Sequence, residues 1–202
     1  SGMSGSIGDD VPTENLYKIA KSYGQRTALY KRLGFDAVTI HMSYRAQVPG
    51  QLLSPLTNFR TDEFGGSFEN RCRFPLLMLE EIKKVAGNDM LIEIQFSAEE
   101  PEGGYTLEEG IEFLKKAQKY VDIVQVRAAD GDYNHPIPFE LNPVPFLELT
   151  EKIKKANLDF VVSNVGGWFY PEMAEKAIAE GKLDMVAMAR AWISNPNYGD
   201  LL

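Results

Sequence analysis

Three residues that can hydrogen-bond or carry charge follow a short apolar run near residue 40. The run in "FDAVTIHM" (35–42) ends at His41, and Tyr44 and Arg45 come within four residues of it. Imidazole and phenol groups can hold a polar ligand atom and move protons, so these residues are candidates for catalysis and substrate binding. A strand-end histidine that only satisfies local hydrogen bonds is the alternative. His135, the only other histidine, lies in "DYNHPIPF" and is a second candidate for substrate contact.

A glycine pair and an arginine near the end of the chain have the chemistry of a phosphate site. Gly166 and Gly167 occur in "NVGGW", and Arg190 follows Ala189 in "MARAW". Glycines let backbone N–H groups approach a phosphate closely, and arginine adds a planar fork of donors. A glycine pair alone would indicate only a turn. Together with Arg190 after the next apolar run, it predicts phosphate binding.

Five short apolar runs alternate with segments of helical periodicity and must position these residues. The runs cover residues 35–42, 90–97, 121–128, 159–167 and 183–190. Strict alternation of strand and helix predicts parallel strands joined by right-handed crossovers. The runs are apolar without a clean period of two, as is typical of strands covered on both faces.

The position of the glycines favours a barrel over a doubly wound sheet. A dinucleotide-binding sheet would place Gly-x-Gly-x-x-Gly after its first strand, and the sequence has no such motif. Phosphate sites after the last two strands are instead a recurring feature of (β/α)₈ barrels, which typically need about 250 residues. We therefore predict an α/β fold, a partial TIM barrel of about five parallel strands over residues 12–202. Residues 1–11 are interpreted as an expression scar, "SGM", and a flexible lead-in.

Composition excludes several other classes of protein. The chain has 202 residues, of which 44% are hydrophobic, and a net charge of −8. An acidic chain is not expected to bind nucleic acid, and no apolar run approaches the roughly 20 residues of a membrane span. Cys72 is the single cysteine, which rules out an internal disulfide and a cysteine-only metal site within one chain. We expect no metal and a cytoplasmic setting.

The polar stretch "SPLTNFRTDEFGGSFENRCRF" (54–74) resembles the signature of the old yellow enzyme family, the FMN-dependent NADH:flavin oxidoreductases. The surrounding motifs "GFDAVTIH", "EEPEGGYTLEEG", "VGGW" and "MARAWISNPN" resemble that family in the same order, from about Pro12 onward. The resemblance implies that the chain covers family strands four to eight. It also implies that Arg60, Asp62 and Arg71 form a scaffold over the strand ends rather than taking part in catalysis.

The same resemblance assigns roles to individual residues. His41 matches the family's first polar ligand for an electron-withdrawing carbonyl, and Tyr44 stands in the slot of the second. Ala46 occupies the slot of the usual tyrosine proton donor, so Tyr44 or Arg45 would take over the polar role. Gln95 occupies the slot of an arginine near the flavin pyrimidine, where a neutral amide supplies no full charge.

The resemblance further implies that Gly166, Gly167, Ala189 and Arg190 bind the phosphate of FMN, with Ala189 in place of a glycine. The implied activity is reduction, or desaturation, of an activated alkene such as an enone or enoyl thioester, with NADH or NADPH as the reductant. One alternative is a truncated or diverged, non-catalytic fragment that does not bind flavin on its own. A different phosphate-binding barrel, such as an aldolase, is less favoured, because no lysine stands at a strand end.

Self-association is the remaining expectation. A barrel that lacks three strands leaves two exposed edges, at residues 36–42 and 185–190. It also leaves the apolar interior uncovered. Exposed edges and apolar patches promote association, and no charge or proline interrupts "AVTI" or "MVAM".

Overall fold

The computed structural model describes residues 11–45, 47–127 and 144–201. The strands are β1 (Ala37–His41), β2 (Leu91–Ser97), β3 (Ile123–Arg127), β4 (Val161–Val165) and β5 (Met185–Ala187). The helices are α2 (Thr13–Arg32), α3 (Val48–Leu53), α4 (Phe68–Ala86), α5 (Leu107–Ala117), α6 (Leu147–Lys155), α7 (Pro171–Ala179) and α8 (Arg190–Ser194), followed by the 3-10 turn η1 (Tyr198–Leu201).

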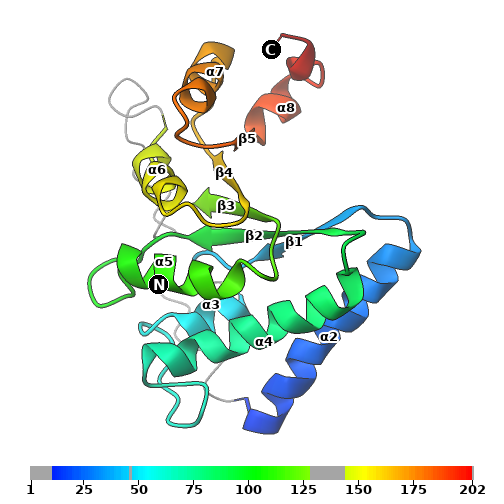
Figure 1. Ribbon diagram of the computed structural model, residues 1–202, viewed down its shortest axis with the longest axis vertical. Helices are drawn as coiled ribbons and strands as arrows, with labels where there is room; N and C mark the ends of the chain where they lie inside the picture. Colours follow the sequence, from blue (N-terminus) through cyan, green and yellow to red (C-terminus); the bar gives the residue numbers. More distant parts are fainter. Residues whose placement is uncertain (1–10, 46, 128–143, 202) are drawn as a thin grey trace.

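The five strands form one parallel sheet in the order β1-β2-β3-β4-β5, as Figure 1 shows. Each strand pairs with the next strand along the chain, and helices fill the crossovers. Sequential order throughout is the arrangement of a barrel, whereas a doubly wound sheet reverses its order near the middle. The predicted partial barrel of five strands is therefore confirmed.

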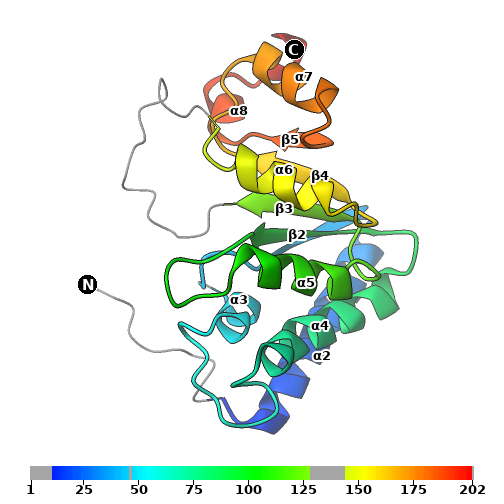
Figure 2. The ribbon, with the colours of Figure 1, turned by 60° about the vertical axis from the view of Figure 1, so that its left-hand side comes forward.

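One face of the sheet is covered by helices and the other is open within the described residues. Figures 1 and 2 show α2, α4 and α5 on the same side of β1 to β3. Buried residues of that face, Ile40, Ile94 and Val126, belong to one core with Phe74 of α4 and Phe113 of α5. Burial consequently alternates along β1, because only every second side chain meets a helix. The sequence indicated strands covered on both faces, and the described chain covers only one.

Helix α4 illustrates how local sequence positions these layers. Ser67 caps its first turn by accepting a hydrogen bond from the Asn70 N–H, as serine commonly does before a helix. Phe74, Met78 and Ile82 recur at helical spacing and are fully buried. The sequence predicts this helix over about 67–85, within one residue of its bounds in the structure at each end.

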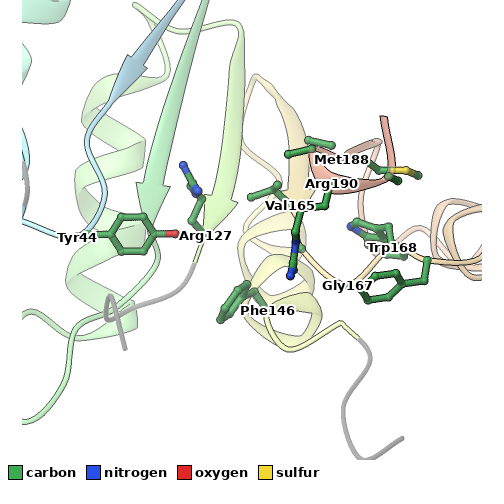
Figure 3. A pocket seen from close by; sticks show the side chains of 13 residues that line it. Tyr44, Arg127, Phe146, Val165, Gly167, Trp168, Met188 and Arg190 are labelled. Atoms are coloured by element: carbon green, nitrogen blue, oxygen red, sulfur yellow. The ribbon is translucent and has the colours of Figure 1, made fainter. Parts of the chain in front are cut away.

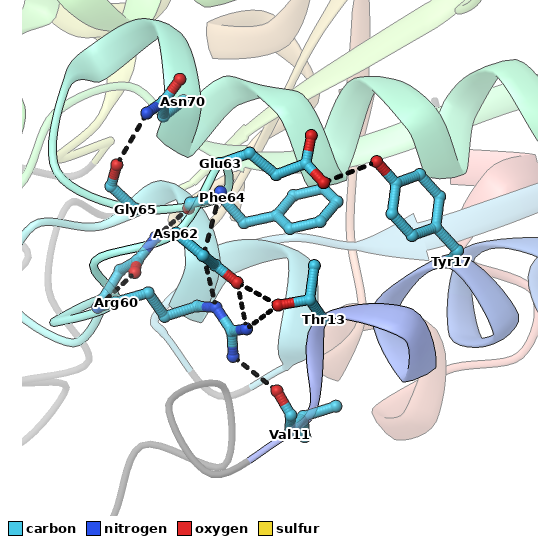
Figure 4. A network of polar contacts seen from close by, with 10 residues as sticks. Val11, Thr13, Tyr17, Arg60, Asp62, Glu63, Phe64, Gly65 and Asn70 are labelled. Atoms are coloured by element: carbon cyan, nitrogen blue, oxygen red, sulfur yellow. Dashed lines mark hydrogen bonds and ion pairs between the residues drawn. The ribbon is translucent and has the colours of Figure 1, made fainter.

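The polar stretch before α4 is ordered by a hydrogen-bond network (Figure 4). Arg60 Nε donates to Asp62 Oδ1 at 3.0 Å, and the Phe64 N–H donates to the same oxygen at 3.1 Å. Arg60 Nη1 reaches the Val11 carbonyl at 2.7 Å, and the Thr13 hydroxyl donates to Asp62. These contacts join the loop to the start of α2, in agreement with a scaffolding role.

A glycine and a short helix complete this stretch. A Cβ at Gly65 would overlap the Arg60 carbonyl oxygen, so only glycine fits there. Arg71 Nε donates to the Leu53 carbonyl at 3.0 Å and fixes the end of α3. The sequence analysis does not predict α3, although Pro49 in its first turn is an available signal.

No helix in the described part of the chain is long and apolar enough to cross a membrane.

We propose that the open face and the outer edge of β1 cause self-association. Leu91, Val161 and Met185 on this face are 49%, 40% and 36% exposed. Size-exclusion chromatography with light scattering, at tens of micromolar and moderate salt, should give a mass above that of one chain. Leu91→Lys should reduce the association, because a charge on the face opposes its burial. Ile178→Lys, on α7 and 43% exposed, is the matched control and should leave it unchanged. A strictly monomeric parent chain would contradict the proposal.

The Arg60–Asp62 network should make stability depend on pH. Hydrogen bonds from the Arg60 guanidinium, and then from Thr13 and the Phe64 N–H, hold the pKa of Asp62 well below its ordinary 3.8. A carboxyl group with a lowered pKa stabilises the fold at pH values above its pKa in the unfolded state. This stabilisation is lost as the pH falls toward the lowered pKa of the folded state.

Asp62→Asn should therefore lower the free energy of unfolding at pH 7 by about 2 kcal/mol, measured by urea denaturation. The free energy of unfolding of this variant should also decrease less than that of the parent between pH 5 and pH 3. Asp89→Asn is the control, because its carboxylate is 82% exposed and lies 3.4 Å from Lys31 Nζ. Exposed pairs of this kind contribute about 0.5 kcal/mol. Equal effects of the two substitutions would show that the network is not a stabilising element.

Candidate functional site

A cavity of about 340 Å³ opens at the carboxyl ends of β3, β4 and β5 (Figure 3). This is the end at which (β/α)₈ enzymes carry their active sites. Its lining combines residues from the strand ends and the loops that follow them: Tyr44, Arg127, Phe146, Val165, Gly166, Gly167, Trp168, Phe169, Ala187, Met188, Ala189, Arg190 and Ala191. Residues more than 140 positions apart in the sequence thus meet at one site.

The loop after β4 depends on its two glycines. Gly166 and Gly167 have φ values of +109° and +82°, a region that other L-residues rarely adopt. The nearest side-chain atom to a Cβ on Gly166 would be on the Phe146 ring at 3.7 Å, which is ordinary contact. The requirement for glycine is therefore conformational rather than steric. The chain turns sharply here, and backbone rather than side chains borders this part of the cavity.

Arg190 and Ala189 lie on the other side of this loop, after β5. Arg190 begins α8, and its exposed side chain lies at the cavity in Figure 3. Ala189 has φ −117°, outside the left-handed region that favours glycine, so the backbone does not require a glycine at this position. The structure brings the predicted phosphate-binding residues together in one cavity.

A buried chain of hydrogen bonds holds the floor of the cavity. Trp168 Nε1 donates to Asn164 Oδ1 at 3.0 Å, and Asn164 Nδ2 donates to Thr150 Oγ1 at 2.7 Å. The Thr150 hydroxyl donates in turn to the Phe146 carbonyl at 2.7 Å. Strand β4 and helix α6 are thereby joined, and the Trp168 ring is fixed against the glycine turn. Trp192 lines no part of this cavity.

The opposite end of the cavity is formed by Tyr44 and Arg127. The Arg127 guanidinium lies over the Tyr44 ring, 5.1 Å from its centroid, and Nη1 donates to Gln95 Oε1 at 2.6 Å. The His41 ring lies next to Tyr44, with their centroids 5.7 Å apart. His41 pairs with Gln95 across β1 and β2, so both side chains point to the open face. His41 and Tyr44, the predicted catalytic residues, are thus neighbours.

The charge state of these side chains follows from their surroundings. Burial, and then the positive charge of Arg127, lower the pKa of His41 below its ordinary 6.5. Burial raises the pKa of Tyr44 above its ordinary 10.0, although Arg127 opposes the shift. At neutral pH the site therefore holds a neutral imidazole and a protonated phenol. Both can donate a hydrogen bond, and Nδ1 of His41 has no hydrogen-bond partner within the described residues.

Tyr44 and Arg45 both have positive φ, at +66° and +54°. Arg45 Nη1 lies 3.5 Å from the Glu100 carboxylate, which is only 3% exposed and also accepts from the Ser54 hydroxyl at 2.6 Å. Burial is the main cause that raises the pKa of Glu100. The guanidinium thus meets a carboxylate of the fold, and contact of Arg45 with a substrate stays a prediction.

Sequence reasoning missed Arg127 and could not place two other residues. Arg127 ends the run "VDIVQVR" on the open face, and a charged residue at the end of an otherwise apolar strand was an available signal. His135 and Ala46 lie outside the described residues, so their predicted roles stay predictions. The residues that the structure describes contain no group of three or more metal-ligating side chains.

Two known proteins are similar to the chain over most of its length. The chain is 42% identical over 196 residues to an NADH oxidase of Thermoanaerobacter brockii and 30% identical over 209 residues to a cinnamate reductase of Clostridium sporogenes. These matches cover 94% and 92% of the chain, but only 29% and 30% of the relatives. The chain therefore spans less than a third of those proteins.

Solved structures agree with the fold. A 2-naphthoyl-CoA reductase superposes with a TM-score of 0.86 at 26% identity, covering 98% of this chain and 32% of that one. Morphinone reductase in complex with tetrahydroNAD superposes with a TM-score of 0.73 at 25% identity, covering 94% and 49%. The family described as NADH:flavin oxidoreductase / NADH oxidase matches residues 9–200. A match over nearly the whole sequence, together with this fold, shows that the chain belongs to the NADH:flavin oxidoreductase / NADH oxidase family.

Proposed function

We propose that the chain is the carboxyl-terminal part of an FMN-dependent barrel that uses NADH or NADPH to reduce, or desaturate, an activated alkene. The observation that carries the proposal is one cavity with two different ends. Gly166, Gly167 and Arg190 border one end, and Tyr44 and Arg127 border the other. Such a cavity suits a ligand with a phosphate and a polar, aromatic ring system.

The residues present fit FMN. Two glycines with positive φ let backbone N–H groups come close to a phosphate, and Arg190 adds a planar cation. A cavity of about 340 Å³ lies in the range of small-molecule sites. Arg127 Nε is buried and has no hydrogen-bond partner in the described part of the chain, so a donor is available at the other end. Gly166, Gly167 and Arg190 would hold the phosphate, and Gln95, Tyr44 and Arg127 would face the ring.

Bound FMN would supply hydride transfer between the nicotinamide and the alkene. The chain's own residues would bind and orient the substrate. His41, neutral at physiological pH, would donate a hydrogen bond to an electron-withdrawing carbonyl of the substrate. Tyr44 would add a second donor beside it. Phe146 and Trp168 would keep water out of the cavity, because their rings cover its walls.

The relatives support an acidic or thioester substrate conjugated to a double bond. The names cinnamate reductase and 2-naphthoyl-CoA reductase describe reduction of an unsaturated carboxylate and an aromatic thioester. Their carbonyl groups are acceptors of the kind that His41 and Tyr44 would bind. The alternative of a non-catalytic fragment is not favoured, because the relatives at 42% and 30% identity are named as enzymes.

Arg190→Gln should weaken FMN binding without weakening riboflavin binding. The reason is that riboflavin lacks the phosphate on which the guanidinium would act. We expect at least a tenfold rise in Kd for FMN, about 1.4 kcal/mol, in calorimetric titrations of the deflavinated full-length protein.

Lys176→Gln removes the same charge from α7, where the lysine side chain is 75% exposed, and should leave both affinities unchanged. A loss of affinity for riboflavin as large as the loss for FMN would assign Arg190 to a structural role.

His41→Ala in the full-length holoenzyme should lower kcat/KM for an enone or enoyl thioester at least tenfold, about 1.4 kcal/mol. The lost hydrogen bond orients the substrate, so the FMN content should stay unchanged. His41→Asn keeps a side-chain donor and should recover part of the activity. Because the pKa of His41 lies below 6.5, activity should not fall between pH 7 and pH 8 through this residue. Unchanged kinetics in the alanine variant would return His41 to a structural interpretation.

A further inference from the structure

Arg127 is held in a fixed position at the carboxyl end of β3. Its Cα pairs with Ser97 of β2, and its side chain projects from the open face of the sheet. Nη1 donates to Gln95 Oε1 at 2.6 Å, and the guanidinium lies 5.1 Å from the centroid of the Tyr44 ring. Contacts from β2 and from the segment after β1 therefore fix both the direction and the plane of the group.

One donor of this guanidinium is left for a ligand. Arg127 Nε is buried, and no atom of the described residues accepts a hydrogen bond from it. A buried donor without a partner costs about 1–3 kcal/mol, and more on a charged group. A structure that fixes the rest of the group while leaving this atom unpaired is arranged for an acceptor that lies outside the described residues.

The nearby carboxylate of Glu93 is already engaged. Glu93 lies on the open face two residues before Gln95, and accepts hydrogen bonds from Thr39 Oγ1 at 2.6 Å and Gln125 Nε2 at 3.1 Å. The groups beside Arg127, His41 and Tyr44, are uncharged at neutral pH. The positive charge of Arg127 is therefore directed at the cavity.

We propose that Arg127 supplies the cation that faces the flavin ring, and that Gln95 and Tyr44 position it there. The proposal rests on the proposed function and deepens it by assigning the ring end of the cavity. Gln95 itself carries no charge. Its side-chain carbonyl oxygen accepts a hydrogen bond from Arg127 and thereby positions the positive charge of that residue, which belongs to the neighbouring strand β3. A cation beside a ring system that gains negative charge on reduction favours the reduced form.

The experiment measures the two-electron reduction potential of the full-length holoenzyme, together with its affinities for FMN and riboflavin. Arg127→Gln should lower the affinities for both ligands to the same degree, because they share the ring. It should also weaken the preference for reduced over oxidised flavin tenfold, which equals a drop of about 30 mV. Arg127→Lys keeps the charge and should retain most of the potential.

Arg190→Gln is the matched control, since it removes an arginine from the phosphate end of the same cavity. It should leave the potential unchanged and weaken FMN alone. An unchanged potential in Arg127→Gln overturns the proposal, and so does an equal drop in both variants.

A double variant tests the proposal if the Arg127→Gln protein does not retain flavin. The double variant Gln95→Arg with Arg127→Gln moves the cation from β3 to β2, between side chains in direct contact. A potential near that of the parent supports the proposal, and one still lower by about 30 mV overturns it. A parent that binds neither FMN nor riboflavin would overturn the proposed function as well. A parent that binds FMN but whose potential is insensitive to residue 127 would overturn this inference alone.

Discussion

The in-register parallel pairing of β1 to β5 is the constraint on which the site depends. Pairing sets His41 opposite Gln95, Ser97 opposite Arg127 and Val165 opposite Ala187. Because side chains alternate between faces, a slip of one residue in any strand would turn its functional side chain into the helix-covered core. The apolar residues between them, such as Ile40, Ile94 and Val126, prevent that slip by their own burial. The burial of these apolar side chains thus determines which polar side chains point to the open face. The apolar side chains themselves line no part of the cavity.

Charged residues outside the cavity hold the loops that border it. Two consecutive non-glycine residues with positive φ, Tyr44 and Arg45, cost about 1 kcal/mol or more each. Arg45 Nη1 lies 3.5 Å from the Glu100 carboxylate, and the Arg127 guanidinium lies over the Tyr44 ring, so contacts from neighbouring elements hold both residues in place. The Arg60–Asp62 network does the same for the segment that leads into α4. Arg60 and Arg71 of the polar stretch thus donate to backbone carbonyls of the fold, whereas Arg127 and Arg190 line the cavity.

Much of the fold could be predicted from the sequence, because local patterns and burial point the same way. The alternation of apolar runs and helical segments predicts five strands within a few residues of their bounds. Thr106 and Glu109 form a capping box at the start of α5, and their spacing of three residues makes it visible in the sequence. The short helix α3 was missed, because six residues carry too little periodicity to distinguish them from a loop. The partnership of Gln95 with Arg127 was also missed. It depends on strand register, which joins residues 32 positions apart and which neither residue reveals alone.

The buried tryptophan has a consequence for how binding at this cavity becomes visible. Trp168 is 3% exposed, lines the cavity and donates its indole N–H to Asn164, whereas Trp192 is 44% exposed beside Tyr198. With only two tryptophans in the sequence, the two rings have distinct surroundings and separable fluorescence emission. Emission from the buried indole lies at shorter wavelengths and would be quenched by energy transfer to an isoalloxazine bound nearby. Trp168 fluorescence should therefore report ligand binding at the cavity. Its indole N–H is hydrogen-bonded to Asn164 of β4, the strand that leads into the Gly166–Gly167 turn.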